Sequence, residues 1–144
     1  MRQEEPITAL SGKHRYEVQV DPDDIDHMGH VNNAVYLTWV QRAVVAYWES
    51  RAPLEALQKI AWVALKHEIE YRRPAFLGDG VIVETVAERL FGVRAFFTTL
   101  IMRGETVLAE VKSSWCSLDS ETHRPVRVAR NVRQLFFGRD ERSK

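Results

Sequence analysis

The chain has 144 residues, with 20 lysines and arginines against 20 aspartates and glutamates and a hydrophobic fraction of 45%. This length suits one domain, residues 1–144, in which we place the core at about 14–128 and a basic C-terminal tail at 129–144. A net charge of zero gives no support to nucleic acid or an anionic membrane as partner, and no stretch reaches the roughly 20 apolar residues of a membrane span. The single cysteine, Cys116, excludes an intrachain disulfide. Since the first twelve residues also lack the apolar run of a signal peptide, we expect a cytoplasmic protein.

The first third of the chain predicts a strand, a polar loop and a long helix. Apolar and polar residues alternate over 15–20, which is typical of a half-buried strand. Helical spacing runs over 33–50, and Asn32 or Asn33 is a suitable N-cap. This helix is apolar over most of its circumference, so we expect other structure to wrap it.

The remainder of the chain favours strands. A short helix over 54–59 precedes a region with a period of two, in which Val63, Leu65, His67, Ile69 and Tyr71 are expected to share one face. Further strands are predicted at 81–90, 93–102 and 106–118, joined by turns short enough for antiparallel hairpins. The order indicates an α+β domain whose antiparallel sheet curls around the long helix.

The segment 24–36 carries the densest chemistry of the chain, with two carboxylates, two imidazoles and two carboxamides around Gly29. It places a carboxylate-bearing loop before the N-terminus of an apolar helix, where backbone N–H groups are unpaired and the helix dipole favours negative charge. A substrate carbonyl at that end would be polarised close to Asp26. The pattern therefore predicts attack on an acyl group.

The spacing Asp24-x-Asp26-x-x-Gly29-His30-Val31-Asn32-Asn33-x-x-Tyr36 resembles the signature of hotdog-fold acyl thioesterases of the 4-hydroxybenzoyl-CoA thioesterase type. Two later segments add to the resemblance: 69–75 followed by Gly78-Asp79, and 111–119 followed by Arg124-Pro125. The resemblance covers about 14–128. It implies a hotdog fold, an antiparallel sheet wrapped around a long central helix, and a homodimer or homotetramer with active sites at the interface. It also implies hydrolysis of an acyl-CoA or acyl-carrier-protein thioester without a metal or other cofactor.

The resemblance assigns the catalytic carboxylate to Asp26, either as nucleophile or as general base on water. It implies that the backbone N–H of Asn33 is an oxyanion donor. His30 matches a catalytic histidine of related acyl-carrier thioesterases, although Met28 stands where that subgroup often has asparagine. The alternative for His30 is a helix-entry histidine that bonds to backbone, and Asp24 is expected to hold the loop.

Four residues are expected to bind substrate: Gly29, Asn32, Tyr36 and His67. Gly29 would let the backbone turn tightly and approach the thioester, and Tyr36 would shape the acyl pocket. His67 lies on the apolar face of its predicted strand, so the alternative is a core histidine whose polar atoms are satisfied.

Two groups of arginines could meet the phosphates of coenzyme A, because a guanidinium can bind phosphate through two parallel hydrogen bonds. The first is Arg72 and Arg73, and the second is the series Arg124, Arg127, Arg130 and Arg133. The alternative for the second group is an amphipathic tail that packs Val128, Val132, Leu135 and Phe136 on the body.

A metal site and two other functions fit the sequence less well than metal-independent thioester hydrolysis. A zinc site at Asp24, Asp26, His27 and His30 is not expected, because Gly29 breaks the helical face that a His-x-x-His pair requires. An enoyl-CoA hydratase of this fold carries an Asp-x-Asn-Pro-x-His pattern, whereas Asp26 and His30 are four residues apart with no Asn-Pro between them. A non-catalytic acyl-CoA-binding module stays the main alternative.

Overall fold

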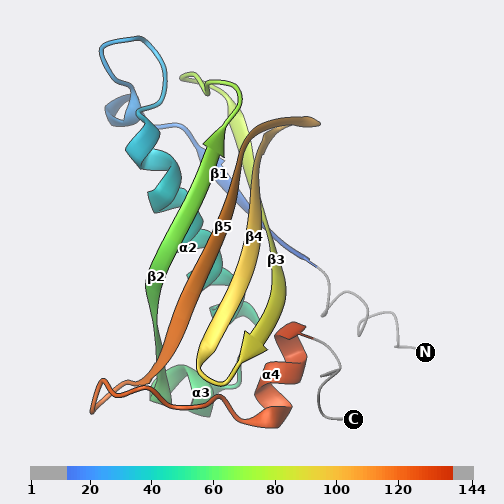
Figure 1. Cartoon of the computed structure of the whole chain (residues 1–144). Coiled ribbons are helices and arrows are strands. Elements are labelled where there is room, and N and C mark those ends of the chain that lie inside the picture. The colour runs from blue at the N-terminus through green and yellow to red at the C-terminus, as the bar shows by residue number, and fades with distance from the viewer. Residues whose placement is uncertain (1–12, 138–144) are drawn as a thin grey trace, which may run out of the picture.

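The structure is a computed structural model that describes residues 13–137, and it consists of one antiparallel sheet curved around one helix (Figure 1). In chain order the elements are β1 (Lys13–Gln19), the 3₁₀ helix η1 (Pro22–Asp24), α2 (Asn33–Arg51), α3 (Leu54–Lys59), β2 (Ile60–Tyr71), β3 (Gly80–Phe91), β4 (Arg94–Arg103), β5 (Thr106–Asp119) and α4 (Arg130–Phe137). The strand order is β1-β3-β4-β5-β2, and all neighbouring strands are antiparallel. The α+β prediction is therefore confirmed.

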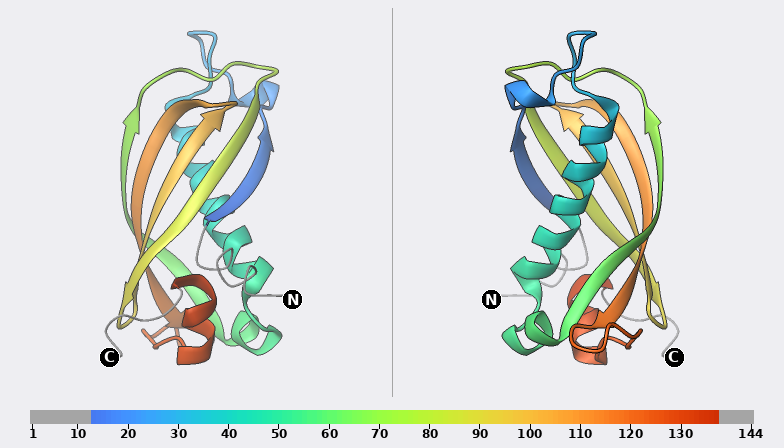
Figure 2. Two further views of the ribbon diagram at one scale, coloured as in Figure 1. Left: turned by 90° about the vertical axis from the view of Figure 1, so that its right-hand side faces the viewer. Right: turned by 90° about the vertical axis from the view of Figure 1, so that its left-hand side faces the viewer.

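The helix α2 lies along the concave face of the sheet (Figure 2). Its inward side is buried and consists of Tyr36, Trp39, Val40, Ala43, Val44, Tyr47 and Trp48. The opposite side is less covered than the sequence suggested, since the side chain of Val45 is 40% exposed. Within the described chain, the sheet thus wraps one side of the helix.

A β-bulge in β2 corrects one expectation about its faces. The pairing with β5 shifts register between Ala64 and Lys66, so the alternation predicted for the whole strand changes side at Leu65. Trp62 and Ala64 pack against the core, whereas Val63 and Leu65 are 43% and 49% exposed. Only the later part of the predicted face, from His67 onward, turns toward the helix.

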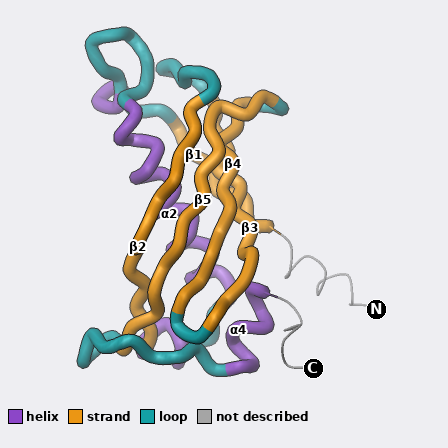
Figure 3. The backbone as a smooth tube through the Cα atoms, viewed as in Figure 1, coloured by secondary structure: helices purple, strands orange, loops and turns teal. Residues whose placement is uncertain are grey.

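The loops gather at the two ends of the molecule (Figure 3). One end carries residues 20–32 and 72–79, beside the start of α2. The other carries α3, residues 120–129 and α4 (Figure 1). No helix among residues 13–137 is long and apolar enough to cross a bilayer.

The helix α4 closes the second end. Val132 and Phe136 are buried, and the ring of Phe136 stacks on Trp48 with centroids 5.3 Å apart. Val128, just before the helix, is buried as well. The amphipathic-tail interpretation is confirmed for these residues, while 138–144 lie outside the described part of the chain.

Candidate active site at the start of α2

The loop before α2 is closed by its own backbone. The N–H of Asp26 donates to the carbonyl oxygen of His30 at 2.9 Å, and the N–H of Gly29 donates to the carbonyl of Asp26 at 3.0 Å. Gly29 has a φ of 88°, a left-handed conformation that glycine adopts without strain. This tight turn places residues 26 and 30 side by side.

The side chain of Asp26 is held in place but remains open to solvent. Its Oδ1 accepts a hydrogen bond from the N–H of Met28 at 2.9 Å and lies 4.0 Å from Nδ1 of His30. The two side chains are 21% and 33% exposed. The carboxylate therefore keeps an oxygen available for a water molecule or a substrate, with an imidazole next to it.

The start of α2 supplies a hydrogen-bond donor. Asn32 is the N-cap, and its Oδ1 accepts from the N–H of Ala34 at 2.9 Å. Asn33 is the first helical residue, and its N–H donates no hydrogen bond to any of the described residues. A free N–H at the positive end of the helix dipole can stabilise negative charge on a substrate oxygen.

A shallow groove of about 250 Å³ begins at this helix end. Its walls are His30, Val31, Asn33, Tyr36, Tyr71, Arg72, Arg73 and Pro74. Asp26 stands beside the groove, next to His30. The structure thus brings together most of the residues that the motif singled out.

Two tyrosines and one buried backbone segment hold the groove together. The N–H of Val31 donates to the carbonyl of Ala75 at 2.9 Å, and the N–H of Ala75 donates to Oη of Tyr36 at 3.1 Å. The hydroxyl of Tyr71 donates to the carbonyl of Asn33 at 2.9 Å. Burial raises the pKa of both tyrosines, so their hydroxyls stay protonated at neutral pH.

Comparison with known proteins identifies the family. Residues 20–136 match the model of the thioesterase-like superfamily. The chain belongs to this superfamily. It is 28% identical to the acyl-acyl carrier protein thioesterase ATL2 of Arabidopsis thaliana, over 90% of this chain and 71% of that protein. It is 26% identical to the long-chain acyl-CoA thioesterase FadM of Escherichia coli, over 82% and 92% of the two chains.

A solved thioesterase from Thermus thermophilus, complexed with coenzyme A and zinc, is similar in structure. It shares 28% identity and a TM-score of 0.73, covering 85% of this chain and 95% of that one. The hotdog fold expected from the motif is thereby confirmed. Among residues 13–137 of the present thioesterase-like chain, no group of three His, Cys, Asp or Glu side chains is placed to hold a metal ion.

The arginines expected to bind phosphate differ in their surroundings. The guanidinium of Arg72 is paired with the carboxylates of Glu70 and Glu110. Arg73 is exposed and has no acidic partner among the described residues. Arg124 and Arg127 belong to the segment 120–129, at the opposite end of the molecule with α3 and α4 (Figure 1). The structure therefore does not bring them to the site of the same chain.

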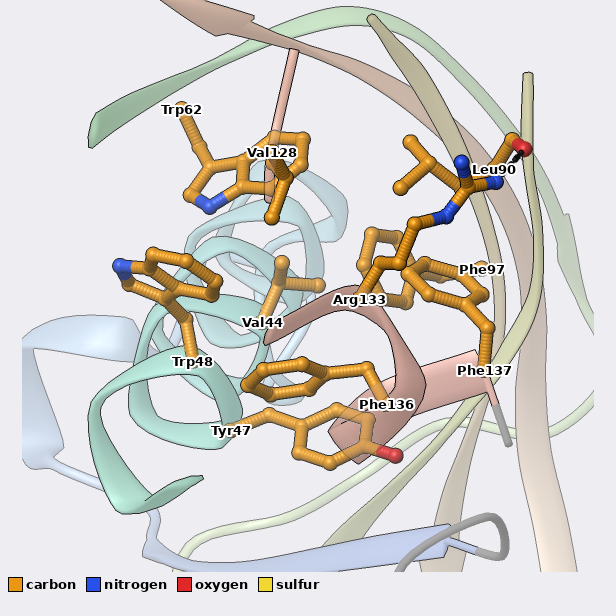
Figure 4. Close-up of a pocket in the computed structure, with 10 residues that line it drawn as sticks. All are labelled: Val44, Tyr47, Trp48, Trp62, Leu90, Phe97, Val128, Arg133, Phe136 and Phe137. Atoms are coloured by element: carbon orange, nitrogen blue, oxygen red, sulfur yellow. Dashed lines mark hydrogen bonds between the residues drawn. The ribbon is translucent and has the colours of Figure 1, made fainter. Parts of the chain in front are cut away.

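An apolar cavity lies at that opposite end, among residues of α2, β2 and α4 (Figure 4). Its walls include Trp48, Trp62 and Phe136, and it leaves about 20 Å³, room for one water molecule at most. Nη2 of Arg133 donates to the carbonyl oxygen of Leu90 at 2.9 Å across one side. This part of the molecule is packed core and does not offer space to a substrate.

Sequence reasoning missed three residues that support the site, namely Tyr71, Asp79 and Arg103. The sequence assigns Tyr71 only to an apolar strand face. Asp79 belongs to the quoted Gly78-Asp79 pair, which is the one available signal. Nothing in the spacing of Arg103 indicates a partner at position 79.

His67 is not part of the groove. Its ring packs edge-to-face against Trp115, with centroids 6.0 Å apart, and neither ring nitrogen has a hydrogen-bond partner among the described residues. Burial lowers the pKa of His67 because the charged form would lose its hydration. These observations favour a core position over a substrate contact. The expectation that a core histidine here would have its polar atoms satisfied is wrong for the described residues.

We expect His67 to make folding stability depend on pH. An unfolded imidazole titrates near pH 6.5, whereas the folded one resists protonation, so the stabilisation is fully present above about pH 6.5 and is lost as the pH falls toward the lower folded pKa. Thermal unfolding between pH 8 and pH 5 should show a smaller acid-side decrease of Tm in His67→Phe than in the wild type. The control His27→Gln, which removes an exposed imidazole, should keep the wild-type slope. Equal slopes for His67→Phe and the wild type would contradict a buried neutral imidazole.

Proposed function

We propose that this protein hydrolyses acyl-CoA thioesters and that Asp26 is the catalytic carboxylate. The observation that carries the proposal is the partly exposed Asp26 carboxylate on the loop that leads into α2, together with the N–H of Asn33, which has no acceptor among the described residues. The names of the similar proteins, thioesterases acting on acyl-CoA or acyl-acyl carrier protein, support the same chemistry.

In the proposed reaction the thioester carbonyl oxygen accepts a hydrogen bond from the N–H of Asn33, and the helix dipole stabilises the charge that develops there. Asp26 then acts in one of two ways. It attacks the carbonyl carbon and forms a mixed anhydride that water hydrolyses, or it takes a proton from water while that water attacks. Both routes release a thiolate and a carboxylic acid. Since a thiol has a pKa of about 8.5, the leaving group departs without a strong acid.

Asp26→Asn should lower kcat at least about 100-fold, because the carboxamide is neither a nucleophile nor a base. Hydrolysis is followed with a thiol reagent over short, long and aromatic acyl-CoAs. The matched control is Asp24→Asn, since the Asp24 carboxylate accepts from the N–H of Asp21 at 2.9 Å and an amide oxygen can replace it. The control should retain nearly full turnover.

Two outcomes would argue against this assignment. Near-normal turnover in Asp26→Asn would place catalysis on another group. A wild-type protein that binds acyl-CoA but hydrolyses none of the thioesters would instead support the non-catalytic binding module.

We further propose that Arg73 binds a phosphate of the coenzyme A nucleotide. It lines the groove beside the helix end and is exposed, whereas the guanidinium of Arg72 is already neutralised by Glu70 and Glu110. A free arginine fork is suited to bidentate phosphate contacts.

Arg73→Ala should raise KM for acyl-CoA about tenfold, as expected for loss of a charge-assisted hydrogen bond, with kcat nearly unchanged. The kinetics of an acyl-pantetheine, which lacks the nucleotide, should not change. Arg72→Ala is the control on the same strand end and should affect KM less. An equal KM increase for both substrates would contradict a nucleotide contact.

We propose that the protein assembles as a homodimer or homotetramer. Val63 and Leu65 expose apolar side chains on β2, which is an edge strand, and exposed edges of this kind are commonly covered by pairing. A second copy on this edge would cover them and extend the sheet.

Light scattering should give two or four times the chain mass of 16.7 kDa. Replacing both Val63 and Leu65 by lysine should shift the population toward the monomer, because like charges would meet in the interface. Leu54→Lys, at an exposed position of α3, serves as the control and should leave the mass unchanged. A wild-type monomer at micromolar concentration would overturn this proposal.

A further inference from the structure

We propose that Asp79 and Arg103 form a clamp that positions the active-site loop against the start of α2 and thereby sets the turnover rate, although neither residue contacts the substrate. This inference rests on the proposed thioesterase function. It concerns the connection 72–79 between β2 and β3, which lies beside the loop that contains Asp26 (Figure 1).

The clamp joins both ends of a short backbone segment. Nη1 of Arg103 donates to Oδ2 of Asp79 at 2.8 Å and to the carbonyl oxygen of Pro74 at 3.1 Å. The same carboxylate oxygen of Asp79 accepts from the N–H of Phe76 at 2.8 Å. One guanidinium and one carboxylate thus hold the residues on either side of Ala75.

Ala75 passes this constraint to the catalytic loop. It is fully buried, and both its N–H and its carbonyl form hydrogen bonds with residues at the candidate site. Its carbonyl accepts from the N–H of Val31 at 2.9 Å, and its N–H donates to Oη of Tyr36 at 3.1 Å. Val31 directly follows His30, so a displacement of Ala75 would move the imidazole that stands next to Asp26.

A ring contact between Phe76 and His30 also links the clamp to the active-site loop. The ring of Phe76 meets the imidazole of His30 edge-to-face, with centroids 6.2 Å apart. The clamp fixes the backbone N–H of Phe76, the residue that carries this ring. His30 is consequently supported through the backbone by Ala75 and through its ring by Phe76.

Because the Asp79–Arg103 ion pair is partly exposed, we expect its loss to affect the turnover rate more than the stability of the fold. The side chains of Arg103 and Asp79 are 33% and 20% exposed, and ion pairs in contact with solvent contribute little to the stability of a fold. Catalysis is more sensitive, because a misplacement of about 1 Å can lower a rate about 100-fold. Loss of the clamp should therefore lower kcat strongly while Tm changes little.

The first experiment measures kcat and KM for Arg103→Leu, Asp79→Ala and the double variant. Each single variant should lower kcat at least about tenfold with KM changed by less than about threefold, and the double variant should be no slower, because the two residues act as one unit. Asp79→Asn keeps an oxygen for the N–H of Phe76 and for Nη1 of Arg103, so this conservative variant should retain most of the wild-type kcat. Arg103→Lys should recover part of the lost kcat, since it keeps the charge.

The control is the ion pair between Arg15 and Glu84, whose atoms lie 3.4 Å apart on the pair β1 and β3. Arg15→Leu removes a partly exposed salt bridge away from the site and should leave kcat unchanged. Additive effects in the double variant, an increase of KM alone, or an unchanged kcat would overturn the clamp.

Hydrogen exchange gives a readout that does not depend on activity. In Arg103→Leu the N–H groups of Val31 and Ala75 should exchange faster, whereas that of Tyr47 in the second half of α2 should not change. Unchanged exchange at Val31 and Ala75 overturns the inference even if the proposed function holds. A wild-type protein inactive on all thioesters overturns the proposed function, while the exchange rates still decide whether the clamp exists.

Discussion

The first backbone N–H groups of a helix have no hydrogen-bond partner inside the helix. The candidate site in this protein depends on the position of these N–H groups at the start of α2. One is satisfied by the side chain of Asn32, which accepts from Ala34. The N–H of Asn33 has no acceptor among the described residues and lies at the groove with the positive end of the dipole. A partner supplied by the protein at this position would remove the donor that we propose for the thioester carbonyl.

Packing along α2 fixes the position of its N-terminal end. Along its buried side α2 contacts the sheet, and at its far end Tyr47 and Trp48 pack against Phe136 of α4. At the near end the hydroxyl of Tyr71 bonds to the carbonyl of Asn33. A helix of 19 residues is about 28 Å long. That length separates the end packed against α4 from the end with the candidate site, and it is the reason why Arg124 and Arg127 cannot serve the site of their own chain.

Local patterns in the sequence were sufficient to predict most of the fold. Alternation indicated the strands, helical spacing indicated α2, and the polar residues around Gly29 indicated the loop that precedes this helix. The bulge at Leu65 was missed, because a single extra residue changes the facing of a strand without altering its composition.

Long-range polar pairs were missed as well, for a different physical reason. The bond between Tyr71 and Asn33 joins residues 38 positions apart, as does the pairing of Arg72 with Glu110. Such pairs depend on which strands become neighbours and on the register between them. Local sequence patterns propose Arg72 and Arg73 together as phosphate ligands. The pairing of β2 with β5 separates them, because it brings Glu110 to Arg72 and leaves Arg73 without an acidic partner among the described residues.

The chemistry of thioesters explains why the polar bonds of the site act on backbone rather than on the reacting groups. A thiolate is a good leaving group, so the reaction needs a carboxylate, an oxyanion donor and correct positions more than a strong acid. The hydrogen bonds of Tyr36, Tyr71, Asp79 and Arg103 all fix main-chain groups around the two loops. None of these bonds depends on the acyl group. Selection among acyl groups must therefore come from other contacts, namely the groove walls near Tyr36 and Pro74 and any surface that a second copy adds along β2.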